Sequence, residues 1–170
     1  MPLVTVSAQS GQVNATWSLP VPPAHVWDGI ASPKRLHLWL GELIEGKIAP
    51  GSTFAVDHGQ GAICRSTVEI YEPGTELAYS WKFSDEPYSR LAWRIETEGT
   101  GSLLSMEHSG LGDLADSYRD GWLAHLIYLE GQLLNLPLPM PMLMTVASTI
   151  TAASQGAASD QSSNDDGATR

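Results

Sequence analysis

Five turn sequences rich in glycine and proline divide the middle of the chain into short segments. They lie at residues 49–52, 59–61, 72–75, 84–87 and 98–101. The segments between them have the length and composition of β-strands, near residues 43–48, 53–58, 62–71, 76–83, 89–97 and 102–109. Because the links are too short to hold crossover helices, the pattern predicts an antiparallel meander.

Signals of another strand and of helices flank this meander. Residues 12–19 alternate apolar and polar side chains, which predicts a half-buried strand. Prolines at 22–23 and the Ser-Pro pair at 32–33 mark the starts of two short helices. From Asp113, apolar residues recur at three- and four-residue steps, which predicts one amphipathic helix of about 22 residues. We therefore expect an α+β domain in which about seven antiparallel strands wrap a long C-terminal helix.

The composition changes after that helix, which sets the expected domain limits. We expect an N-terminal extension over residues 1–9 and a folded unit over residues 10–136. A strap rich in proline and methionine follows over residues 137–144. Residues 145–170 are mostly small and polar, which predicts a disordered tail. Removal of this tail should then leave the melting temperature nearly unchanged.

The charge and the cysteine count exclude several classes of protein. The chain has 19 acidic and nine basic residues, a net charge of −10 that disfavours binding to nucleic acid or to an anionic membrane. Its single cysteine, Cys64, excludes an internal disulfide and a thiolate metal cage. The start shows no basic region followed by an apolar one, and prolines interrupt the longest apolar stretch. We expect a cytoplasmic protein with no stable membrane insertion.

Seven short motifs follow one another in an order typical of a known superfamily. They are the sequences at 23–28 (PAHVWD), 39 (W), 50–54 (PGSTF), 72–73 (EP), 77–81 (LAYSW), 108–111 (HSGL) and 121–122 (GW). Over about residues 10–135 the chain resembles the START-related helix-grip (SRPBCC) superfamily. Within it, the chain is similar to the group named after activators of a heat-shock protein's ATPase.

The resemblance implies both a fold and a range of functions. Its members have a curved seven-stranded antiparallel sheet that wraps the C-terminal helix and leaves an apolar cavity between them. They bind lipids, hormones, polyketides or other hydrophobic molecules, and some catalyse cyclisation or dehydration. Members with a co-chaperone role carry an additional N-terminal domain, which the leading residues 1–9 do not supply.

The strand and helix periods select the residues that face such a cavity. The candidate ligand-binding residues are Phe54, Val56, His58, Ser66, Val68, Tyr79, Trp81, Trp93, Met106, His108, Tyr118, Trp122 and His125. An inward histidine can act as a general base or orient a polar ligand group, and the alternative is a hydrogen-bonded core residue. The same alternative holds for Tyr79 and Tyr118, which combine an apolar ring with a polar end.

Three functions remain open from the sequence. The first is binding of a small hydrophobic molecule, which we favour because no paired acid–base constellation is visible. The second is a cyclase or dehydratase acting on a hydrophobic substrate, which needs His58, His108 or His125 beside Tyr79 or Tyr118. The third is regulation of a heat-shock ATPase. We assign no catalytic residue, expect neither cofactor nor metal, and expect a monomer or weak homodimer that does not bind nucleic acid.

Overall fold

The computed structural model describes residues 3–165 and confirms an α+β architecture. Its strands are β1 (Leu3–Gln9), β2 (Gln12–Leu19), β3 (Glu42–Gly46), β4 (Thr53–Asp57), β5 (Ile63–Glu72), β6 (Glu76–Trp81), β7 (Ser89–Glu98) and β8 (Gly101–Ser109). Its helices are α1 (Pro23–Ala31), α2 (Pro33–Leu36), α3 (Ala115–Leu133) and α4 (Leu143–Asp165), with 3₁₀ turns η1 (Gly112–Leu114) and η2 (Met140–Met142). The strands predicted from the turn signals are all present, with ends shifted by two residues or fewer.

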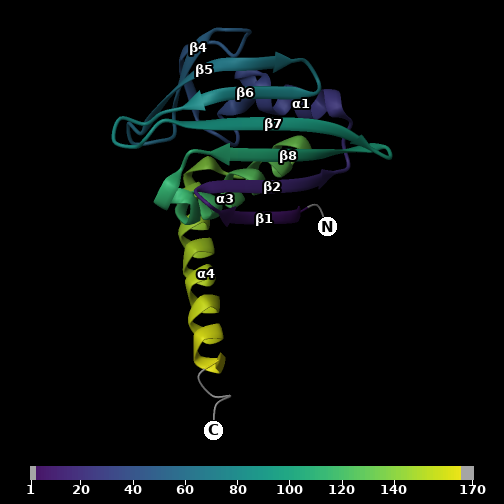
Figure 1. Cartoon of the computed structure of the whole chain (residues 1–170). Coiled ribbons are helices and arrows are strands. Elements are labelled where there is room, and N and C mark those ends of the chain that lie inside the picture. The colour runs from purple at the N-terminus through teal and green to yellow at the C-terminus, as the bar shows by residue number, and fades with distance from the viewer. Residues whose placement is uncertain (1–2, 166–170) are drawn as a thin grey trace.

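The strands form one antiparallel sheet in the order β1-β2-β8-β7-β6-β5-β4-β3. Strands β3 to β8 are the predicted meander, and β2 extends the sheet by pairing with β8. Figure 1 shows α1 and α3 behind the strands, so one face of the sheet packs against helices. The side chains on that face are apolar and buried, whereas the opposite face carries charged residues such as Arg94 and Glu96.

The N-terminal residues form an eighth strand, which corrects the predicted count of about seven. The segment expected to be an extension pairs with β2, and Ser10 and Gly11 turn the chain between the two strands with φ of 52° and 72°. Two consecutive positive φ angles are typical of the tight hairpin turn that matches strand twist. Val6 and Ala8 of β1 pack on the core, so the strand belongs to the domain.

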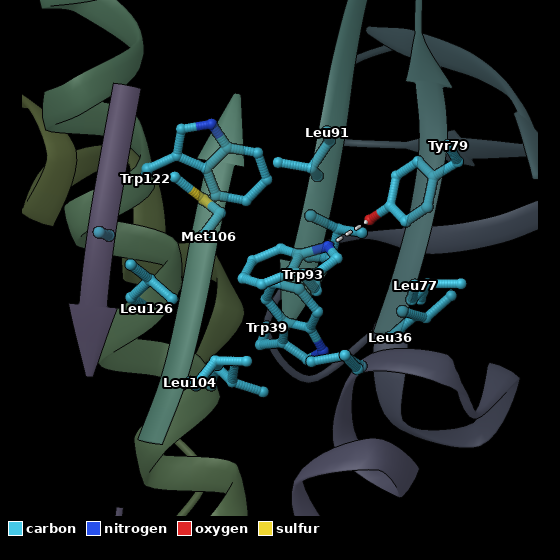
Figure 2. Close-up of a cluster of buried hydrophobic side chains, with 14 of the residues drawn as sticks. Leu36, Trp39, Leu77, Tyr79, Leu91, Trp93, Leu104, Met106, Trp122 and Leu126 are labelled. Atoms are coloured by element: carbon cyan, nitrogen blue, oxygen red, sulfur yellow. Dashed lines mark hydrogen bonds between the residues drawn. The ribbon is translucent and has the colours of Figure 1, made fainter. Parts of the chain in front are cut away.

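Aromatic side chains fill much of the space between the sheet and the helices. Trp39, Trp93 and Trp122 are all buried, and Figure 2 shows them packed together among leucines. Trp93 donates a hydrogen bond from Nε1 to the hydroxyl of Tyr79 at 3.2 Å, and the rings of Trp39 and Trp93 meet edge-on at 5.9 Å. Since each buried aromatic ring removes roughly 150–250 Å² from water, this cluster dominates the core.

Helix α4 occupies a segment for which the composition predicts disorder, so the predicted tail is wrong over this helix. Its inward side chains share one helical face: Leu143, Val146, Ala147 and Ile150. Leu143 is buried and the other three are partly buried against the core. Further along, Ser154 donates to the Asp120 carboxylate of α3 at 3.4 Å. Figure 1 shows α4 running on past the edge of the sheet.

The link between α3 and α4 differs from the predicted extended strap. Leu136 donates from its backbone nitrogen to the Gly131 carbonyl, and the hydroxyl of Tyr128 donates to the Pro139 carbonyl at 3.1 Å. The chain then turns through η2 directly into α4. The side chain of Leu136 stays 70% exposed, so the alternating apolar residues of this segment do not all dock on the domain.

Deletion of residues 145–170 is now expected to destabilise the protein rather than leave it unchanged. The deletion removes the partly buried Val146, Ala147 and Ile150, for which we expect a loss of about 1–3 kcal/mol in the free energy of unfolding. Thermal unfolding followed by circular dichroism measures this loss. Deletion of residues 157–170, which keeps these contacts, is the matched control and should change the melting temperature little. Equal melting temperatures for the two deletions would contradict the packing role of α4.

Candidate functional site

A cavity of about 240 Å³ lies where β6, α3 and the start of α4 meet. Its walls come from the end of β4, from β6 and the loop after it, and from both helices. They consist of His58, Trp81, Phe83, Glu86, Ser117, Tyr118, Gly121, Trp122, Ala124, His125, Leu143, Met144 and Ala147. Most of this lining is apolar or aromatic, with a few polar groups between the rings. This composition is typical of a site for a small organic molecule.

Larger hollows lie elsewhere on the molecule but have a different character. Two of them, of about 440 and 500 Å³, lie along the charged face of the sheet and are lined by residues such as Arg94 and Arg65. These two arginines are paired with Glu76 and Glu45 at 3.6 and 2.7 Å. The linings of both hollows are largely polar or charged, and the arginines are already paired with carboxylates, so we do not assign the site of an apolar ligand to these hollows.

One wall of the cavity holds a short chain of hydrogen bonds. Trp81 donates from Nε1 to the hydroxyl of Tyr118 at 3.1 Å, and Tyr118 in turn donates to the carboxylate of Glu86. Burial, followed by the hydrogen bond to Glu86, raises the pKa of the Tyr118 hydroxyl. Tyr118 therefore keeps its proton at neutral pH and holds the Glu86 loop against α3.

The lining of the cavity also holds two imidazoles, those of His58 and His125, whose rings meet edge-on at 5.8 Å. Nδ1 of His125 lies 2.6 Å from the backbone carbonyl of Trp39. Nε2 of His58 is buried, and no hydrogen-bond partner for it exists within the part of the chain that the structure describes. Burial, and secondarily the charge of His125, lowers the pKa of His58 to about 3, and burial lowers the pKa of His125. Both rings are neutral at pH 7.

His108 lies outside this cavity, and both of its ring nitrogens are occupied. Trp122 donates from Nε1 to Nδ1 of His108 at 2.9 Å, so the ring proton is on Nε2, which faces the hydroxyl of Ser89 at 2.9 Å. The Ser89 hydroxyl in turn donates a hydrogen bond to the backbone carbonyl of Trp81 at 3.2 Å. Burial lowers the pKa of His108 to about 3. With no free acceptor nitrogen, this histidine is built as a packing and hydrogen-bonding residue rather than a general base.

The structure brings together five of the residues that the sequence selects for the site. His58, Trp81, Tyr118, Trp122 and His125 line the cavity. The others face inward as predicted but do not line it: Phe54, Val56, Ser66, Val68, Tyr79, Trp93, Met106 and His108. They are buried because the rings fill the interior; for example, Phe54 packs edge-on against Tyr79 at 5.1 Å.

The site also includes residues that the sequence does not select. They are Phe83, Glu86, Ser117, Gly121, Ala124, Leu143, Met144 and Ala147. Phe83 shares the inward phase of Tyr79 and Trp81, so its strand pattern could have found it. Glu86 lies in a turn, where periodicity does not predict the orientation of a side chain. Leu143, Met144 and Ala147 belong to α4, most of which the composition predicts to be disordered.

The structure places no cluster of metal ligands within residues 3–165, that is, no group of three His, Cys, Asp or Glu side chains suited to an ion. Burial raises the pKa of the Cys64 thiol to about 11, which leaves this residue unreactive at neutral pH. Over the same residues, no helix is long and apolar enough to cross a membrane.

The chain matches the model of a known protein family. A family model described as Activator of Hsp90 ATPase homolog 1-like protein matches residues 20–131. The chain belongs to this family. The family match confirms the resemblance seen in the motifs, and it ends before η2 and α4. The α4 wall of the cavity therefore lies outside the residues that the family model matches.

Solved structures share the fold. The crystal structure of CalU16 from Micromonospora echinospora has a TM-score of 0.69 at 22% identity, covering 89% of this chain and 93% of CalU16. DynU16, from the dynemicin biosynthetic locus, has a TM-score of 0.67 at 25% identity over 74% of this chain and 48% of DynU16. MLL2253 from Mesorhizobium loti has a TM-score of 0.68 at 24% identity, covering 75% and 99%. No curated protein matches the chain.

Proposed function

We propose that the protein binds a small hydrophobic molecule in the cavity between β6, α3 and α4. The observation that carries the proposal is the cavity of about 240 Å³ whose lining includes the aromatic rings of Trp81, Phe83, Tyr118 and Trp122. Pockets for drug-sized ligands measure roughly 300–1,000 Å³, so the ligand is small, with one or two aromatic rings. Flat apolar ligands gain both burial and ring contacts between such walls.

Two further observations support a binding role. The cavity has few polar groups, namely two neutral imidazoles and the hydrogen-bonded Tyr118–Glu86 pair, and so few groups suit the orientation of a ligand rather than its solvation. In addition, the fold is shared by DynU16, a protein from the dynemicin biosynthetic locus.

A cyclase-type enzyme is the second candidate, because His58, His125 and Tyr118 surround the same cavity. A general base acts best when its pKa lies near the working pH, and His58 with a pKa of about 3 is a weak base. The described residues show no hydrogen bond between these histidines and Tyr118, whose proton is directed at Glu86. We therefore favour binding over chemistry. The co-chaperone role stays a prediction, which a measurement of heat-shock ATPase rate tests.

Gly121 offers a direct test of the binding site. It lies on the cavity side of α3, and a Cβ placed on it would meet no atom within 4 Å. Gly121→Leu should fill the cavity and weaken binding of the neutral two-ring fluorescent probe 1-aminonaphthalene at least roughly tenfold. Gly121→Ala is the matched control: it should bind the probe almost as the wild type does and gain about 0.5–1 kcal/mol of stability in the helix. Equal probe affinity in all three proteins would place binding elsewhere.

A further inference from the structure

We propose that His125 determines which ligands the cavity accepts, by taking a hydrogen bond at Nε2 from a hydroxyl group on an aromatic ligand. His58 is the second partner of the same hydroxyl. This inference rests on the proposed function, since it assumes that a ligand occupies the cavity. It narrows the ligand class from hydrophobic molecules in general to neutral aromatic molecules that carry a phenol- or enol-type hydroxyl.

The backbone fixes the tautomer of His125. Its Nδ1 lies 2.6 Å from the carbonyl oxygen of Trp39, and a carbonyl oxygen can only accept a hydrogen bond. Nδ1 therefore carries the ring proton. In the neutral ring the other nitrogen, Nε2, then has a lone pair and no hydrogen. A ligand group that binds to Nε2 of His125 therefore has to donate a hydrogen bond.

His58 supplies the complementary group. Its Nε2 is buried and is without a hydrogen-bond partner among the described residues, a state that is costly inside a protein. Its ring centre lies 5.8 Å from that of His125, and hydrogen bonds of about 2.8 Å from each ring can meet at one small group between them. When the ring proton of His58 is on Nε2, a hydroxyl satisfies both rings, because it donates to Nε2 of His125 and accepts from Nε2 of His58. A ligand with no polar group leaves both nitrogens unpaired.

The charge of the site excludes a carboxylate in the same position. Glu86 is the one formally charged side chain among the described residues that line the cavity, and its carboxylate already accepts the proton of Tyr118. A second carboxylate would meet this negative charge and the bare nitrogen of His125. An ammonium group would have to leave water for walls made mostly of aromatic rings, which disfavours it against a neutral hydroxyl.

A set of ligands with the same ring system tests the assignment. Dissociation constants are measured by calorimetry for naphthalene, naphthol, naphthoate and aminomethylnaphthalene on the full-length protein. We expect naphthol to bind roughly tenfold more tightly than naphthalene, and naphthoate more weakly than either. Tighter binding of naphthoate or of the ammonium compound than of naphthol would overturn the proposal.

The ratio of the naphthol to the naphthalene dissociation constant is the readout that a structural role of His125 would not move. His125→Phe should abolish the naphthol preference, and His125→Gln, which keeps a hydrogen-bonding group, should retain part of it even if the Phe variant folds poorly. His37→Phe places the same substitution at an exposed residue outside the cavity and should keep the preference.

A preference for naphthol that survives in His125→Phe would overturn the assignment. Equal binding of naphthol and naphthalene to the wild type would overturn this inference alone, whereas failure of all four ligands and of 1-aminonaphthalene to bind would overturn the proposed function as well.

Discussion

Replacement of Trp122 by alanine is expected to lower the free energy of unfolding by about 3–5 kcal/mol, the usual cost of truncating a buried tryptophan. Trp122 is 2% exposed, and its ring lies 5.4 Å from that of Trp81 and 5.6 Å from that of Trp93. It thereby joins the packed core to the cavity wall. The same substitution leaves Nδ1 of His108 without its donor, which adds a buried unpaired acceptor to the lost volume.

The two contributions can be separated with a second variant. Trp122→Phe keeps an aromatic ring but removes the N–H group, so we expect a smaller loss of about 1–3 kcal/mol. For a chain of 170 residues, the alanine variant should melt roughly 10 °C or more below the wild type. Far-ultraviolet circular dichroism is the suitable probe, because both variants lose a tryptophan fluorophore. An alanine variant as stable as the phenylalanine variant would show that packing around Trp122 contributes little.

The strands were predictable because their signals are local. Glycine and proline turns delimit each strand, and the predicted strand over residues 12–19 coincides with β2, Gln12–Leu19. The alternation of side chains also gives the inward face correctly. The alternation does not show which of the inward residues line the cavity. Trp81 and Trp93 both face inward, yet Trp81 lines the cavity and Trp93 is enclosed by the core. That difference depends on which helix packs opposite each strand position.

Helix α4 shows how composition can mislead. Its sequence is rich in Ala, Ser and Thr, which suggests too little apolar surface to order a chain. The few apolar positions nevertheless recur at helical spacing: Leu143, Val146, Ala147 and Ile150. A test for periodicity would have indicated the helix, and with it three residues of the cavity wall. The position of Glu86 beside Tyr118 could not be found in this way, because it depends on a loop folding back on a helix 32 residues further along the chain.

Acid is expected to destabilise the protein through its buried histidines, and His108 gives the clearest case. His108 is fully buried with a pKa of about 3, against roughly 6.5 for an unfolded histidine. Between these values the unfolded chain binds one proton more than the folded chain, so stability falls as the pH is lowered through this window. From pH 7 to pH 5 the loss from His108 is about 2 kcal/mol. The lowered pKa values of His58 and His125 act in the same direction.

His108→Gln tests the origin of this acid sensitivity. Glutamine does not titrate, so the variant should lose less stability than the wild type between pH 7 and pH 5, by about 2 kcal/mol. The variant is expected to be weaker at pH 7, because it disturbs the bonds to Trp122 and Ser89. The decisive quantity is therefore the difference between the two pH values, measured by urea unfolding, and not the stability at either one. His37→Gln, at an exposed position, should keep the wild-type difference. An unchanged pH difference in His108→Gln would mean that this ring takes up its proton without unfolding, which its two occupied nitrogens and complete burial argue against.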